Sequence, residues 1–168
     1  MRERLKMHTE HQRDQSMQVE RYNPVQLNQL SERVIGLCID VHRETGPGLL
    51  ESVYEECLCV LLAEARIEFT RQGEIPVRFR GRTISQGFRY DVLVEGKLLI
   101  ELKSVEKTAP IHKAQVITYL RLLPAPLGLL VNFNSERLIQ GVSRLIHPSM
   151  APAFSTSGPS GALCPIPS

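Results

Sequence analysis

The chain has 168 residues, of which 42% are hydrophobic and 23% are charged, the balance expected of one globular domain rather than two. Its formal net charge of +2 is too small to indicate nucleic-acid binding by itself. No apolar run approaches the roughly 20 residues of a membrane helix, and the N-terminus lacks the hydrophobic stretch of a secretory signal. We therefore expect a cytoplasmic protein without a membrane partner.

Composition divides the chain into three parts. Residues 1–22 are polar and charged without periodicity, which predicts a disordered extension, and Met17 within it is an alternative start. Residues 149–168 are rich in proline, serine and glycine and predict a disordered tail. Residues 23–148 between them predict one domain. The four cysteines form no CxxC pair and are expected to be intracellular thiols, most of them in the core.

Two helices are predicted at the start of this domain. Asn23 is a typical helix cap and Pro24 suits the first helical position, so a helix should begin there and end near Gly46. A second helix is expected within residues 48–67, where apolar side chains recur every three or four positions. Both helices carry an apolar stripe that must face a common core.

The pattern then alternates with period two, which predicts strands. Strands are expected at residues 75–80, at 88–94 and, after the turn "EGK", at 98–105. A helix at 111–123 and a continuously apolar strand at 127–133 follow, and residues 137–146 form either an edge strand or a short helix. This order predicts a single α/β domain with a mixed β-sheet flanked by helices.

The stretch "IELKSV" places two charges on one face of the third strand, because Glu101 and Lys103 are two residues apart. Asp91 lies on the preceding strand, and its facing depends on the loop. A two-residue turn would set Asp91 opposite Ile100, whereas a three-residue loop or a bulge would set it opposite Glu101. In the second geometry two carboxylates and an ammonium converge, a grouping that suits Mg²⁺ or Mn²⁺ and the hydrolysis of a phosphodiester.

The string "RYDVLVEGKLLIELKSV" resembles the D…(D/E)xK signature of the PD-(D/E)xK nuclease superfamily, with Asp91, Glu101 and Lys103 at the motif positions. Tyr90 stands where the superfamily name has proline. "GLLESVY" resembles the signature of the GxxExxY protein family, whose three fixed letters correspond to Gly48, Glu51 and Tyr54. The resemblance covers residues 25–147.

This resemblance implies a restriction-endonuclease-like fold and further site residues. In the superfamily an acid from the helix before the sheet often joins the metal site, and Glu51 occupies that place. A QxxxY pair on the helix after the ExK strand is found in a RecB-like branch, and Gln115 and Tyr119 match it. The implied metal ligands are Glu51, Asp91 and Glu101, and Glu51 also fits a helix-capping acid. Gly48 and Tyr54 are expected to be structural.

The predicted function is metal-dependent cleavage of DNA or RNA, with Lys103 assisting the attacking water and a possible homodimer as the working unit. Two other interpretations stay open. One is a nucleic-acid-binding or accessory protein that keeps the fold without cutting, and the other is a salt-bridge network on a half-solvated sheet. A cluster of arginines on the first strands could meet a phosphate backbone, and its members are Arg78, Arg80, Arg82 and Arg89.

Overall fold

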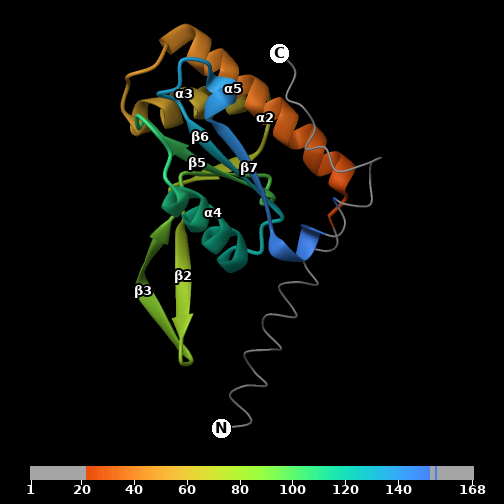
Figure 1. Ribbon diagram of the computed structural model, residues 1–168. Helices are drawn as coiled ribbons and strands as arrows, with labels where there is room; N and C mark the ends of the chain where they lie inside the picture. Colours follow the sequence, from red (N-terminus) through yellow and green to blue (C-terminus); the bar gives the residue numbers. More distant parts are fainter. Residues whose placement is uncertain (1–21, 152–153, 155–168) are drawn as a thin grey trace.

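The computed structural model describes residues 22–151 and residue 154 (Figure 1). Its helices and strands alternate along most of the chain. In chain order they are α2 (Pro24–Thr45), α3 (Glu51–Glu64), β1 (Phe69–Arg71), β2 (Glu74–Phe79), β3 (Arg82–Arg89), β4 (Val92–Val94), β5 (Leu98–Lys103), α4 (Pro110–Leu122), β6 (Leu127–Asn132), α5 (Leu138–Gly141), β7 (Val142–Ile146) and the 3₁₀ turn η1 (Pro148–Met150).

Five of the strands form one mixed sheet in the order β1-β4-β5-β6-β7. Strands β5 and β6 run parallel, while the other neighbouring pairs run antiparallel. Strands β2 and β3 pair only with each other in a separate two-stranded sheet. The predicted fold class, a mixed sheet flanked by helices, is confirmed.

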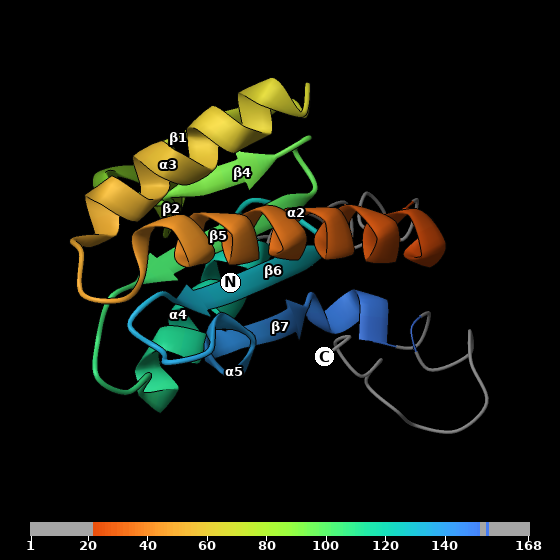
Figure 2. The same ribbon diagram turned by 90° about the horizontal axis from the view of Figure 1, so that it is seen from above.

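Helices cover both faces of the central strands (Figures 1 and 2). On β5, Leu98, Ile100 and Leu102 join the core beneath α2 and α3, whereas Leu99 packs with the residues of α4. The same alternation holds on β6, where every residue is buried. This explains why residues 127–132 are apolar without a period, as expected for a strand covered on both faces.

The first helix begins and ends where the sequence predicts. The side chain of Asn23 accepts a hydrogen bond from the backbone N–H of Val25, and Pro24 takes the first helical position. Gly46 ends the helix with a positive φ of 67°, which favours glycine. The loop that follows lets α3 turn back against the sheet.

One predicted strand is divided in two. The expected strand at residues 88–94 splits between β3, which pairs with β2, and the short β4, which belongs to the main sheet. The break falls at Tyr90, whose ring packs so tightly over Gly73 that a Cβ there would lie 2.1 Å from the phenol oxygen. Sequence alternation continues through the break, so the pattern does not reveal it. Strand β1 was not predicted because its three residues are too few to show a period.

The last segment contains both of the predicted alternatives, since α5 is a single helical turn and β7 is the edge strand. The core continues past residue 148, because Met150 is buried in it. Cys38 and Cys59 are buried thiols, as predicted. The expected extension 1–22 and tail 149–168 lie almost wholly outside the described residues. No helix in the described part of the chain is long and apolar enough to span a membrane.

Candidate active site

The loop between β4 and β5 decides where Asp91 lies. Val94 pairs with Leu98, so three residues, 95–97, form the connection. Glu95 and Gly96 both have positive φ values, 49° and 62°, as a tight hairpin turn requires. The ladder ends at the pair Val92–Ile100, so Asp91 comes directly after the last pair and does not lie opposite Ile100. The three-residue loop that the site hypothesis requires is therefore present.

Glu101 is the most constrained residue of the site. It is only 2% exposed and lies on the same face of β5 as Leu99, toward α4. Its Oε1 accepts a hydrogen bond of 2.7 Å from the Lys103 ammonium, while its Oε2 is buried with no hydrogen-bond partner among the described residues. Burial and the nearby charge of Asp91 raise the pKa of Glu101 to about 7, against the opposing effect of Lys103.

Asp91 lies at the end of the β4–β5 ladder. Its Oδ2 accepts a 2.7 Å hydrogen bond from the backbone N–H of Leu102, in place of a ladder carbonyl. Burial raises the pKa of Asp91, although this hydrogen bond and the charge of Lys103 lower it. The pKa of Lys103 is also raised: burial lowers it, but the hydrogen bond and charge of Glu101 outweigh burial. Lys103 is therefore an ammonium at neutral pH.

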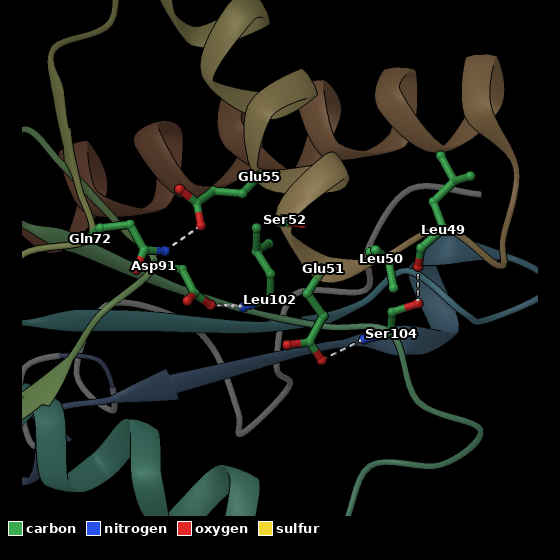
Figure 3. A pocket seen from close by; sticks show the side chains of 9 residues that line it. All are labelled: Leu49, Leu50, Glu51, Ser52, Glu55, Gln72, Asp91, Leu102 and Ser104. Carbon is green, nitrogen blue, oxygen red and sulfur yellow. Dashed lines mark hydrogen bonds between the residues drawn. The ribbon is translucent and has the colours of Figure 1, made fainter.

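Glu51 reaches the site from the first turn of α3. Its Oε1 accepts a 3.0 Å hydrogen bond from the backbone N–H of Ser104, directly after β5 (Figure 3). The Ser104 hydroxyl donates to the Leu49 carbonyl at 2.6 Å, so two bonds tie the start of α3 to the end of β5. The charge of Glu51 contributes to the pKa values of Asp91, Glu101 and Lys103, which places Glu51 within electrostatic reach of all three.

A pocket of about 550 Å³ opens between the start of α3 and the end of β5. Glu51, Glu55 and Asp91 all contribute to its wall (Figure 3), whereas Glu101 and Lys103 do not line it. Glu101 lies instead on the side of the sheet that α4 covers. The acids therefore approach one another from the pocket side and from the α4 side of the sheet.

Sequence reasoning missed Glu55, which is only 5% exposed and lines the same pocket. Its Oε1 accepts a 2.8 Å hydrogen bond from Arg71, and its Oε2 accepts one from Gln72. Its charge raises the pKa of Asp91. The available signal was its position one helical turn after Glu51, which places both acids on one face of α3.

Helix α4 contributes the pair Gln115 and Tyr119. As their spacing predicts, the two side chains share a face, and the Gln115 amide donates to the Tyr119 hydroxyl at 2.7 Å. Tyr119 is 3% exposed. Its pKa is raised by burial, and the charges of Glu101, Lys103 and Asp91 also act on it. The pair therefore lies on the Glu101 side of the sheet, within electrostatic reach of the acids.

Gly48 and Tyr54 have structural positions. Gly48 has a φ of 100°, a conformation that other residues rarely adopt. Tyr54 is fully buried, stacks on Phe133 with ring centroids 4.3 Å apart, donates to the Gly46 carbonyl and accepts from the N–H of Leu49. Together these contacts shape the loop that presents Glu51 at the start of α3.

Comparison with known families gives one result. A family model described as the PD-(D/E)XK nuclease superfamily matches residues 28–145, which is more than half of the chain and contains the whole sheet apart from the last residue of β7. The chain belongs to the PD-(D/E)XK nuclease superfamily. No curated protein and no solved structure shows a significant match.

Membership in the PD-(D/E)XK superfamily accounts for the mixed sheet, since this architecture is restriction-endonuclease-like. Nucleases of this superfamily act on nucleic acid and typically use divalent metal ions. The match identifies the family and no individual catalytic residue.

The carboxylates present are the ligand type that a hard divalent cation prefers, although they do not form a complete coordination site. Among residues 22–151 and 154, no group of three or more histidine, cysteine or acidic side chains lies close enough to hold an ion. Each of Glu51, Asp91 and Glu101 is instead bound to an internal donor. However, Glu101 keeps one buried, unpartnered carboxylate oxygen and lies within electrostatic reach of Asp91, and oxygen atoms of this kind are what Mg²⁺ and Mn²⁺ bind.

Proposed function

We propose that this protein is a Mg²⁺- or Mn²⁺-dependent nuclease that hydrolyses phosphodiester bonds of DNA or RNA. The observation that carries the proposal is the buried Oε2 of Glu101, which has no partner among the described residues, in a side chain within electrostatic reach of a second carboxylate, Asp91. Leaving a buried carboxylate oxygen unsatisfied is costly, and such groups are retained where a ligand completes them. A divalent cation is the ligand that two adjacent carboxylates accept.

In this proposal Asp91 and Glu101 hold the cation, and Glu51 binds or orients it from α3. The bound metal supplies Lewis-acid polarisation of the scissile phosphate and a more acidic water. Lys103 presents an ammonium on the same face as Glu101, where it orients the attacking water and offsets charge developing on the phosphate. Gln115 and Tyr119 steady the site or the substrate from α4 through their mutual hydrogen bond.

Membership of the GxxExxY family is part of the same proposal. Its three fixed residues have related roles here, since Gly48 and Tyr54 shape the loop that leads to Glu51. The cytoplasmic location and the homodimer remain predictions. One chain carries the whole proposed residue set, so a second copy is not needed to complete the site. The boundaries of the domain at residues 23 and 148 also remain predictions.

The proposal is tested with purified protein and labelled single-stranded DNA, double-stranded DNA and single-stranded RNA, each incubated with Mg²⁺, Mn²⁺ or EDTA. The test variants are Asp91→Asn, Glu101→Gln and Lys103→Met, which change charge with little change in volume. The matched control is Glu64→Gln, an exposed acid on α3. We expect cleavage by wild type and the control in either metal, and none in EDTA or by the three test variants.

The second candidate is a binding or accessory protein that keeps the fold without cutting. Calorimetry of Mn²⁺ binding separates the two functions. Metal binding that depends on Asp91 and Glu101, together with cleavage, supports the nuclease. Failure of wild-type protein to bind metal or cut any of the three substrates would exclude the enzymatic function and favour the binding protein.

A further inference from the structure

The β2–β3 hairpin extends away from the body of the protein, past α4 (Figure 1). It pairs with no strand of the main sheet within the described residues. Its six-residue strand β2 spans about 20 Å at the usual rise per residue. We call residues 74–89 the arm. An exposed two-stranded hairpin of this length is marginally stable alone, so its surface chemistry is informative.

One face of the arm carries apolar side chains from its root to Phe79, where Arg82 lies opposite. Ile75, Val77 and Phe79 alternate along β2, and Phe88 and Ile84 lie opposite the first two. At the root this face is covered: Ile75 is fully buried in the cluster that includes Tyr119 of α4. Phe88, opposite Ile75, contacts Tyr119 but is still 48% exposed, and further out Ile84 and Phe79 are 41% and 62% exposed. Exposed apolar surface of this kind marks an interaction site.

The arm is also strongly cationic. Between Glu74 and Arg89 it carries four arginines and one acid. All four guanidinium groups are exposed, and none forms an ion pair with a residue that the structure describes. Arg82 lies directly across from Phe79, and the guanidinium of Arg80 lies 5.4 Å from the centre of the Phe79 ring. Aromatic rings among arginines are the combination that binds bases and phosphates together.

The root of the arm adjoins the proposed active site. The ring of Phe88 lies 5.4 Å from the ring of Tyr119, at a tilt of 47°. Tyr119 in turn bonds Gln115 and lies within electrostatic reach of Glu101 and Lys103. A strand lying along the arm would therefore lead toward Glu101, on the α4 side of the sheet.

We propose that the arm is the substrate-binding element of this protein and that it holds single-stranded nucleic acid, with bases stacked on Phe79 and Phe88 and phosphates paired with the arginines. This inference rests on the proposed function and deepens it by naming the substrate class. A single strand fits better than a duplex because only unpaired bases expose a face on which a ring can stack. A second copy of this chain fits poorly, because two arms would bring eight arginines together.

Stacking is tested first, with a fluorescent reporter. The chain contains no tryptophan, so Phe79→Trp introduces a single indole at the exposed end of the arm. In EDTA, where nothing is cut, its emission should be quenched by a single-stranded 20-mer of DNA or RNA and much less by the matching duplex. The control is Val60→Trp, an exposed position on α3. Equal quenching of both reporters, or none at Phe79→Trp at concentrations that saturate binding, would overturn the stacking.

Affinity is tested by fluorescence anisotropy with the same labelled strands in EDTA. Phe79→Ala should weaken binding about tenfold, within the range found for base–aromatic stacking. The double variant Arg80→Gln/Arg82→Gln should lower the slope of log K against log salt by about 1.4, because each single-strand phosphate contact contributes about 0.7. Arg33→Gln, an exposed arginine on α2, is the control. Comparing the DNA and RNA strands shows which of the two the arm prefers.

The result separates this inference from the nuclease. Glu101→Gln should bind single strands like wild type but not cut them. Wild-type protein that cuts in Mg²⁺, with unchanged binding by the Phe79 and arginine variants, would refute the arm and leave the nuclease standing. Binding that depends on the arm, without cleavage in any metal, would support the arm and refute the nuclease. A dimer that Phe79→Ala converts to monomers, with nucleic-acid binding unchanged, would identify the arm as a contact between copies and refute the inference.

Discussion

The unpartnered carboxylate of Glu101 makes a prediction about stability in the absence of metal. Burial and the charge of Asp91 disfavour the charged form of this side chain in the folded protein. Replacing Glu101 by glutamine keeps the shape and removes the ionisation. The variant also loses the charge-assisted bond from Lys103, but the raised pKa of that lysine keeps it protonated at acidic and neutral pH. The effect of this bond on the titration is already contained in the pKa of Glu101, because the bond favours the ionised carboxylate.

The sign follows from proton binding. Between pH 4.5 and about 7 the folded protein retains a proton on Glu101 that the unfolded chain has released. The free energy of unfolding contributed by this group therefore falls as the pH rises through that range, and it is constant above it. A pKa raised from 4.5 to about 7 corresponds to at most about 3 kcal/mol, at about 1.4 kcal/mol per unit. Relative to wild type, the free energy of unfolding of Glu101→Gln should therefore rise by up to about 3 kcal/mol as the pH increases from 4.5 to 7.5.

The measurement is urea denaturation in EDTA at half-unit steps from pH 4.5 to 8.5, for wild type, Glu101→Gln and the exposed control Glu64→Gln. The quantity compared is the variant's free energy of unfolding minus that of wild type, in which the titration of other groups largely cancels. It should rise for Glu101→Gln and stay flat for Glu64→Gln. Surface substitutions usually change stability by about 0.5 kcal/mol. If the difference for Glu101→Gln stays constant within that amount across the pH range, burial does not raise the pKa of this carboxylate and the reasoning is refuted.

Three further predictions concern the site and its support. Saturating Mg²⁺ or Mn²⁺ should stabilise wild type by about 3 kcal/mol at one hundred times the dissociation constant, and Asp91→Asn should abolish this gain in thermal melts. Gly128→Ala should cost about 1–3 kcal/mol in urea denaturation, because the new Cβ would lie 2.7 Å from the Val116 side chain of α4. Glu55→Ala should cost about 1–2 kcal/mol by the same assay, since it removes the bonds from Arg71 and Gln72, although Arg71 keeps its bridge to Glu56. Unchanged stability in any of the three would contradict the contact on which that prediction depends.

Much of the fold could be predicted because the pattern is local. The Asn23 cap, the glycine after α2 and the uniformly apolar strand β6 each indicate their structure from a few neighbouring residues. The prediction failed where pairing partners are distant in sequence. Strand β1 shows no pattern of its own, and the break at Tyr90 depends on contact with Gly73. Alternation alone cannot tell which sheet a strand joins.

The candidate site divides in the same way. Local spacing alone places Glu101 with Lys103 on one strand face, and Gln115 with Tyr119 on one helix face, because the periods of strand and helix are properties of the backbone. Glu55 was missed because its burial depends on Arg71 and Gln72, which a different segment supplies.

By itself the sequence determined the helices, most of the strands and the residue types of the proposed site. Only the tertiary structure decided that the β4–β5 loop has three residues, so that Val92 rather than Asp91 pairs with Ile100. It also decided that β2 and β3 leave the sheet as an arm. The physical reason is that register and sheet membership depend on which distant side chains are buried together, and a one-residue change in register reverses every side chain on a strand.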